Sequence, residues 1–318
     1  MSFDVILPFL RPIEHLIKDP GVSEIMVNGP GSVFVERQGQ LELVPGVSIS
    51  ERSLEVAVRN IARALGDEIN EEKPLLDSRL PDGSRVAAVF PPCSVRGTTL
   101  TIRKFQSNFF TCEELVRIDS LTDELLAFLK EAVSLHKNIL ISGGTGTGKT
   151  TLLNALSAFI NDDERVVLIE DTAEIQIDKP NMVRFEARRE QTGVPAVTIR
   201  DLLKATLRHR PDRILLGEVR GGEAFDLLQA LNTGHSGTLS TIHANSAQQA
   251  VSRFTSCVLQ SGVELPYVAV RRNIADALNL LLHIQRRKGQ RYVSELLAIE
   301  GYDPDRDQYK LKPIFLRH

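Results

Sequence analysis

The hydrophobic pattern of the first hundred residues alternates short apolar runs with turn residues and contains one clear helical repeat. Apolar residues recur at helical spacing over 54–65, and Gly66 is placed to end that helix. Short β-branched runs on either side of Gly, Pro and Asn residues are typical of β-hairpins. The expected strands lie within 33–35, 41–44, 77–92 and 98–105. This pattern predicts a small α+β domain over 1–107.

Beyond residue 117 the pattern changes to strands and helices in alternation. Ser120 and Asp123 lie in capping-box register at the start of an amphipathic helix. The elements that follow are a strand at 138–142, a helix at 151–160, a strand at 166–170, a helix at 197–207, a strand at 214–218, a helix from about 222 and a strand at 238–243. Such alternation predicts an α/β domain over 118–318, with a mostly parallel sheet covered on both faces. We expect a linker over 108–117 between the two domains.

Composition favours a soluble cytoplasmic protein, with 42% hydrophobic and 25% charged residues. No uncharged apolar stretch approaches the roughly 20 residues that a membrane-spanning helix requires. The N-terminus carries Asp4, Arg11 and Glu14 and lacks the pattern of a signal peptide. The cysteines are scattered and form no C-x-x-C pair, so free thiols in a reducing cytosol are expected for Cys93, Cys112 and Cys257.

The balance of charged residues bears on whether the protein binds nucleic acid. The formal net charge is −3, and the first domain holds 12 Lys and Arg against 14 Asp and Glu. A protein whose main work is to grip a nucleic-acid backbone usually has a basic domain. Neither domain is basic here, so direct nucleic-acid binding is not expected, and a helicase or recombinase is disfavoured.

The most informative segment is GGTGTGKTT at residues 143–151, which matches the phosphate-binding pattern G-x-x-x-x-G-K-[ST]. It stands between a predicted strand and a predicted helix, as that pattern requires. Glycines let successive backbone N–H groups surround phosphate oxygens, and the helix N-terminus adds its positive dipole end. Lys149 would reach the β- and γ-phosphates of ATP, and the Thr150 hydroxyl would bind Mg²⁺. The predicted nucleotide-binding residues are Gly143, Gly144, Thr145, Gly146, Thr147, Gly148, Lys149, Thr150 and Thr151.

Acidic residues follow two of the predicted parallel strands, where the ligand crevice of such a sheet lies. Glu170 and Asp171 follow one strand, and Glu218 ends another. Hydrolysis needs one carboxylate to order the Mg²⁺ shell and another to activate water. We assign water activation to Glu218 and the outer metal shell to Glu170 and Asp171. In the alternative reading, Glu218 is a structural partner of Arg220, and the other two acids belong to a solvated helix start.

Histidines and arginines complete the set of candidates. His243 follows an apolar strand, where it can hydrogen-bond a γ-phosphate, and His235 lies in the same Gly/Ser/Thr-rich segment. Their eight-residue separation fits no usual metal-ligand spacing. Charge on a transferred phosphoryl group is commonly neutralised by an arginine. Spacing does not choose among the candidates Arg85, Arg96, Arg103, Arg208, Arg210 and Arg213.

Read together, four motifs resemble the signatures of a known group. GGTGTGKTT, IEDTAEIQ, LRHRPDRILLGEVRGGEA and NTGHSGTLSTIHANS occur in the order of the Walker A, Asp-box, variant Walker B and His-box motifs of the secretion-superfamily ATPases. Those are hexameric ring motors of type IV secretion and conjugation, type II secretion and type IV pili. EIMVNGPGSVFVERQG, DSRLPDGSRVAAVFPP and LTIRKF are similar to their amino-terminal domain. The resemblance extends from about Val22 to Phe315 and is closest to the Tad/Flp-pilus and conjugal-transfer branch.

This resemblance implies a RecA-like P-loop domain and a role for each matching residue. Lys149 and Thr150 would contact phosphate and Mg²⁺. Glu170 would be the key acid of the Asp box, and Glu218 the catalytic glutamate. His-box and amino-terminal-domain roles would fall to His235, His243, Arg85 and Arg103, the two arginines reaching the nucleotide in a closed state of the ring.

The sequence therefore predicts a cytoplasmic, homohexameric ATPase that docks on inner-membrane platform proteins of a secretion, conjugation or pilus machine. The absence of a paired C-x-x-C insertion disfavours the type II secretion branch. Two other classes stay open. Strong stimulation of hydrolysis by DNA would indicate a RecA-like helicase or recombinase. A single hydrolysis event per binding cycle would indicate a nucleotide-gated assembly switch.

Overall fold

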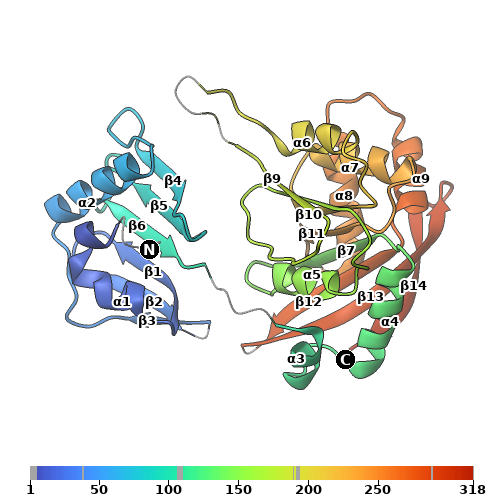
Figure 1. Ribbon diagram of the computed structural model, residues 1–318, viewed down its shortest axis with the longest axis horizontal. Coiled ribbons are helices and arrows are strands. Elements are labelled where there is room, and N and C mark those ends of the chain that lie inside the picture. The colour runs from blue at the N-terminus through green and yellow to red at the C-terminus, as the bar shows by residue number, and fades with distance from the viewer. Residues whose placement is uncertain are drawn as a thin grey trace. The chain divides into compact units, whose positions relative to one another are not determined.

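The structure is a computed structural model that describes residues 6–37, 39–105, 110–188, 190, 194–287 and 289–317. The chain divides into two compact units, residues 1–108 and 109–318, and each is described by itself (Figure 1). None of the described helices is long and apolar enough to span a membrane.

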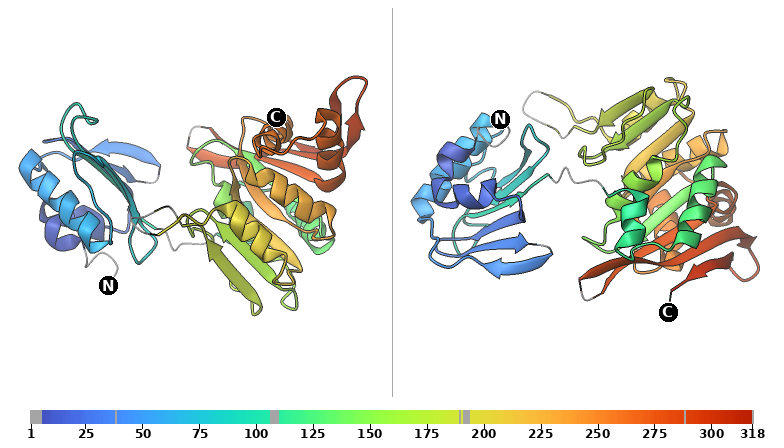
Figure 2. Two further views of the ribbon diagram at one scale, coloured as in Figure 1. Left: turned by 90° about the horizontal axis from the view of Figure 1, so that it is seen from above. Right: turned by 60° about the horizontal axis from the view of Figure 1, so that its bottom comes forward.

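The first unit is a six-stranded antiparallel sheet with the order β3-β2-β1-β6-β5-β4 and helices on one face (Figures 1 and 2). Its elements are η2 Leu7–Phe9, η3 Arg11–Ile13, α1 Glu14–Lys18, β1 Val22–Asn28, β2 Val33–Arg37, β3 Gln40–Leu43, α2 Glu51–Ala64, β4 Leu75–Arg79, β5 Arg85–Val89 and β6 Thr99–Arg103. Alternate strand residues pack under α2, whose apolar face includes Leu54, Val58 and Ile61. The opposite face of the sheet, which these helices do not cover, carries charged residues such as Glu24, Arg85 and Arg103 among apolar ones such as Met26 and Phe34.

The second unit is an eight-stranded mixed sheet with the order β14-β13-β12-β7-β11-β10-β8-β9. The six strands from β12 to β9 in that order are parallel, and β13 and β14 add antiparallel strands at one edge. Its elements are α3 Cys112–Arg117, α4 Asp123–Ser134, β7 Ile139–Gly143, α5 Lys149–Ser157, β8 Val166–Glu170, β9 Met182–Glu186, α6 Ile199–Thr206, β10 Arg213–Val219, α7 Glu223–Asn232, β11 Leu239–His243, α8 Ala247–Leu259, α9 Tyr267–Ala277, β12 Leu280–Arg287, β13 Gln290–Asp303 and β14 Gln308–Leu316.

Helices cover both faces of this sheet, which confirms the predicted α/β class. Helices α3, α4 and α5 pack on one face, and α6, α7, α8 and α9 pack on the other. Neighbouring residues of the buried strand β7 divide between the two cores: Leu140 packs with α6 to α9, and Ile139 and Ile141 pack with α3 to α5. A strand buried on both sides reads as a continuous apolar run, and this is the pattern from which β7 was predicted.

Three local expectations differ from the structure. Thr122, and not Ser120, caps α4 by accepting a hydrogen bond from the Leu125 amide. The segment expected as a linker contains α3, whose Cys112 and Leu115 are buried in the core of the second unit. Sequence patterns also did not reveal β4 or the strands from β12 to β14. Of these, β12 pairs with the distant strand β7, whereas β4, β13 and β14 pair with their neighbours in the chain.

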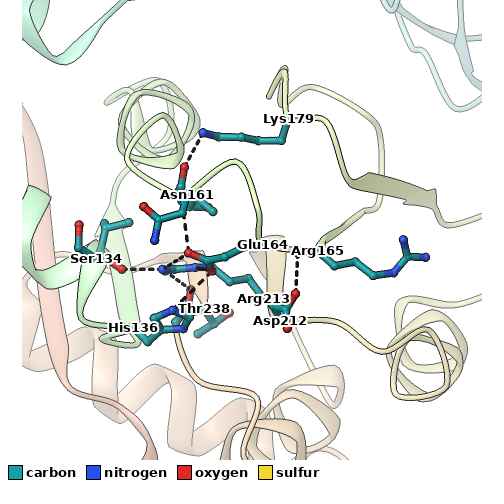
Figure 3. A network of polar contacts seen from close by, with 12 residues as sticks. Ser134, His136, Asn161, Glu164, Arg165, Lys179, Asp212, Arg213 and Thr238 are labelled. Atoms are coloured by element: carbon teal, nitrogen blue, oxygen red, sulfur yellow. Dashed lines mark hydrogen bonds and ion pairs between the residues drawn. The ribbon is translucent and has the colours of Figure 1, made fainter.

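The amino ends of the parallel strands are joined by a buried ionic network (Figure 3). Arg213, at the start of β10, is 0% exposed and forms an ion pair with Glu164, just before β8. Its guanidinium also donates to the main-chain carbonyls of Val133 at 2.8 Å and Gly237 at 3.3 Å. His136 Nε2 lies 3.6 Å from the Glu164 carboxylate. Every buried charge here has a partner, as burial requires.

Candidate functional site

The glycine loop leaves the carboxyl end of β7 and leads directly into α5. Gly146 and Gly148 have φ values of 69° and 98°, in the left-handed region that glycine adopts at little cost. Gly143 has a different reason: a Cβ atom there would lie 2.5 Å from the main-chain oxygen of Ile284. The conformation of the loop therefore explains three glycines of the motif before any ligand is considered.

Lys149 lies within this loop and is 8% exposed. Its Nζ donates to the carbonyl oxygens of Gly143 at 3.2 Å and Gly144 at 2.9 Å. Thr147 Oγ1 donates to the same Gly144 oxygen at 2.9 Å, which closes the turn. Burial lowers the pKa of Lys149, and the charge of Glu218 opposes that shift. An ammonium held by loop carbonyls at a helix N-terminus is placed for an incoming phosphate oxygen.

A chain of polar contacts runs from this lysine to Glu218. Nζ of Lys149 lies 3.4 Å from His243 Nδ1, and His243 Nε2 lies 2.8 Å from Glu218 Oε1. Arg220 donates to Glu218 Oε2 at 2.7 Å and to Asp171 Oδ2 at 2.8 Å. Glu218 Oε1 is buried, and His243 Nε2 lies within hydrogen-bond distance of it, although the geometry of this contact is not that of a hydrogen bond. The structure therefore brings the Glu218 carboxylate and the P-loop lysine together at the carboxyl end of the sheet, with His243 between them.

The contact between His243 and Glu218 involves a neutral ring. Burial is the largest influence on His243, and with the nearby charge of Lys149 it lowers the pKa of the imidazole. Since the ordinary value is 6.5, the ring is neutral at neutral pH. A neutral imidazole beside a carboxylate can pass a hydrogen-bonding change from one neighbour to the other.

Glu170 is buried at the end of β8, and both of its oxygens have partners. Oε1 accepts hydrogen bonds from the backbone amides of Glu174 at 2.7 Å and Ile175 at 2.8 Å, and Oε2 lies 3.4 Å from Arg184. Burial raises the pKa of Glu170, and these hydrogen bonds oppose the rise. The solvated helix start considered for this segment is wrong, because residues 171–181 contain no helix.

Gly217, which stands where many P-loop enzymes have an acid before the glutamate, has a steric explanation. A Cβ atom at Gly217 would lie 3.1 Å from Cγ of Glu170. Glycine therefore leaves room for the buried carboxylate on the neighbouring strand, since such a distance is tighter than ordinary van der Waals contact.

The described residues contain no group of three His, Cys, Asp or Glu side chains that could hold a metal ion. This agrees with Mg²⁺ in P-loop sites, which is bound through one hydroxyl, phosphate oxygens and water rather than by a protein cage. Thr150, half-buried in the first turn of α5, supplies such a hydroxyl. The donor set therefore fits a Mg²⁺ ion that arrives with a nucleotide.

The two histidines that were grouped by sequence are separated. His235 follows α7, and its Nδ1 lies 3.2 Å from the Ala230 carbonyl oxygen. It precedes β11, whereas His243 is the last residue of that strand. The two therefore lie at opposite ends of β11, and His235 does not reach the P-loop of its own chain.

The structure also places the arginine candidates in different parts of the molecule. Arg213 is buried at the amino end of the sheet, away from the P-loop, so it is excluded as a phosphate-contacting arginine. Arg85 and Arg103 belong to the first unit, where they are directly opposite each other on β5 and β6. Both lie on the face of the sheet that the helices leave open, and Arg103 Nη2 lies 3.2 Å from Glu24.

Arg291 is a P-loop contact that sequence reasoning missed. Its Nε donates to the Gly146 carbonyl oxygen at 3.0 Å. In the sequence, basic residues cluster around a Lys-Gly pair within residues 286–291. Nothing in that local sequence indicates that the segment lies beside the P-loop.

Comparison with known proteins identifies the family of this chain. The family described as "Type II/IV secretion system protein" matches residues 9–298. The conjugal transfer protein TrbB of Rhizobium radiobacter is 38% identical over 290 residues, which are 90% of this chain and 86% of that protein. The type IV secretion system protein VirB11 of Bartonella henselae is 32% identical, with 98% of this chain and 95% of that protein covered.

Solved structures give the same result. The VirB11 ATPase from the Brucella suis type IV secretion system, in complex with sulphate, is 32% identical with a TM-score of 0.51, and covers 92% of this chain and 94% of its own. The Legionella pneumophila ATPase DotB has a TM-score of 0.62 at 20% identity, covering 92% of this chain and 81% of its own. At that identity the second likeness supports the fold alone.

Proposed function

The chain belongs to the family of type II/IV secretion system proteins, and from this premise we propose that it is an ATP-hydrolysing ring motor of a type IV secretion, conjugation or pilus machine. The observation that carries the proposal is the contact chain from Lys149 through His243 to the buried Glu218 oxygen. In this contact chain the Lys149 ammonium and the Glu218 carboxylate lie at the same end of the parallel strands, which supports the proposal.

We propose the following roles for the chain's own residues. The amides of residues 143–151 surround the phosphates of ATP, and Lys149 neutralises charge at the β- and γ-phosphates. Thr150 would hold Mg²⁺, which would supply positive charge beside the phosphates, and Asp171 and Glu170 would act on the ion only through water. Glu218 accepts a proton from the attacking water through Oε1. His243, as the shared neighbour, senses whether the γ-phosphate is present.

The working assembly is proposed to be a homohexamer in the cytoplasm, bound at the inner membrane through platform proteins. The names of the relatives, a conjugal transfer protein and a type IV secretion protein, support this choice of machine. In such an assembly the nucleotide site can be completed by residues outside the P-loop domain. We propose that Arg85 and Arg103, on the open face of the first unit, are such residues.

Two substitutions test the proposal. Lys149→Ala should weaken ATP binding at least about tenfold, because it removes contacts already present with bound ATP. Glu218→Gln should bind ATP with near-parent affinity but hydrolyse it roughly 10²-fold more slowly, because a positioned base acts mainly on the transition state. Affinity by calorimetry and steady-state phosphate release are the measurements. Parent-like turnover in Glu218→Gln would remove Glu218 from its role.

We further propose that Arg85 and Arg103 neutralise γ-phosphate charge as it develops. The Arg85→Ala/Arg103→Ala double variant should lose at least about tenfold in turnover, roughly 1.4 kcal/mol of barrier, with a much smaller change in ATP affinity. Alanine at both Arg52 and Arg63, which removes the same charge from exposed positions of α2, serves as the control, and oligomer size is measured in each variant. A double variant as active as the control would reject the assignment.

A further inference from the structure

The hairpin formed by β12 and β13 makes one wall of the glycine loop. Strand β12 pairs with β7 up to His283 and Ser142, and then continues beyond the end of that strand. At this point the main-chain oxygen of Ile284 faces Gly143. The Cδ1 atom of the Ile284 side chain would lie 3.7 Å from a Cβ atom at Gly148. The extended hairpin runs beside α5 in Figure 1.

Two arginines stand on the P-loop side of this hairpin. Arg286 and Arg291 are direct cross-strand partners. The Arg291 Nε donates to the Gly146 carbonyl at 3.0 Å, and its Cδ would lie 3.5 Å from a Cβ atom at Gly148. Arg286 Nη1 would lie 3.7 Å from a Cβ atom at Gly146. Strand alternation places the intervening Arg287 on the opposite face.

Like charges directly opposite each other weaken an antiparallel pair, so this arrangement has a cost for the hairpin. The same arrangement raises the positive potential beside a loop whose amides are turned toward an anion. Arg286 and Arg291 therefore add to the attraction that the loop itself exerts on a bound anion.

The order of strands decides which part of the nucleotide the pair faces. In the sequence β12-β7-β11-β10, the strand that leads into the P-loop lies between the hairpin and the strands that carry His243 and Glu218. The two arginines and Glu218 therefore approach the loop from opposite sides. Since Glu218 marks the side of the γ-phosphate, the arginines face the end of the loop that receives the α- and β-phosphates.

We infer that Arg286 and Arg291 are nucleotide-binding residues of the same chain that bind the α- and β-phosphates shared by nucleoside di- and triphosphates. This inference rests on the proposed nucleotide-binding function. It assigns to the carboxyl-terminal hairpin a direct part in holding the nucleotide, both before and after hydrolysis.

The test compares the Arg286→Gln/Arg291→Gln double variant with Arg287→Gln, which removes the same kind of charge from the other face of the hairpin. Calorimetry on the full chain measures affinity for ADP and for a non-hydrolysable ATP analogue. The double variant should lose roughly tenfold or more for both ligands, with the ratio of the two affinities unchanged, because charge-assisted hydrogen bonds to shared phosphates are lost. Arg287→Gln should stay within about twofold of the parent.

Two results would overturn the inference. The double variant could bind both ligands as Arg287→Gln does, or it could lose affinity for the triphosphate analogue alone, which would place the arginines at the γ-phosphate. Lys149→Ala, measured in parallel, separates this failure from failure of the proposed function. If Lys149→Ala also binds both ligands like the parent, the P-loop assignment itself is wrong. Thermal unfolding without nucleotide verifies that each variant is folded. If the double variant is unfolded, the single Arg291→Gln variant is measured in its place.

Discussion

The two ends of the parallel sheet use the same three residue types for different purposes. Each end holds a glutamate, an arginine and a histidine in contact: Glu164, Arg213 and His136 at the amino end, and Glu218, Arg220 and His243 at the carboxyl end. The side chain of Arg213 is 0% exposed, whereas that of Arg220 is 53% exposed. Burial, and not residue type, therefore distinguishes an internal brace from a site that can receive a ligand.

The partners explain the difference. At the amino end, main-chain carbonyls of α4 and of the segment before β11 complete the hydrogen bonds of Arg213, so no ligand can compete for them. At the carboxyl end, Arg220 bridges two carboxylates at the surface, and Glu218 keeps one buried oxygen without a hydrogen bond among the described residues. Among the described residues of these two networks, the atom without a hydrogen bond therefore lies at the end of the sheet that carries the P-loop.

The largest expected effect separates the two arginines by stability. Arg213→Met should lower the free energy of unfolding by about 3–5 kcal/mol, because it leaves the Glu164 charge buried without its partner. The matched Arg220→Met should cost less than about 1 kcal/mol, because exposed ion pairs contribute little. Urea unfolding followed by circular dichroism measures both variants. Equal losses would contradict the distinction between a buried and an open network.

A smaller effect sharpens the same comparison through pH. Burial alone would raise the pKa of Glu164, but hydrogen bonding and charge attraction from Arg213 outweigh it and hold the pKa below the ordinary 4.5. A carboxylate with a lowered folded pKa contributes stability above its unfolded pKa, and this contribution is lost as pH falls through the folded value. The stability gap between the parent and Glu164→Gln should therefore be full at pH 7 and shrink below about pH 4.5. A gap that stays constant from pH 7 to pH 3 would contradict this role.

Sequence patterns predicted the parts of the site that are set by local structure. The P-loop and Glu218 were found because a strand, its terminal residue and the following turn are neighbours in the chain. Arg291 was missed because its contact with the P-loop depends on the pairing of β12 with β7, which the local sequence does not show. Arg213 stayed among the arginine candidates because the sequence does not show that it is buried at the amino end of the sheet. The roles of the individual site residues remain proposals.

The close packing of Gly217 against Glu170 has a consequence for how this chain can diverge. Glu170 holds the segment after β8 through two backbone amides, and no larger residue fits at 217 without moving it. A side chain at 217 would therefore require Glu170, 47 residues away in the chain, to shift by a few tenths of an ångström. In descendants of this chain, a side chain gained at 217 should be accompanied by a shorter acid, or none, at 170.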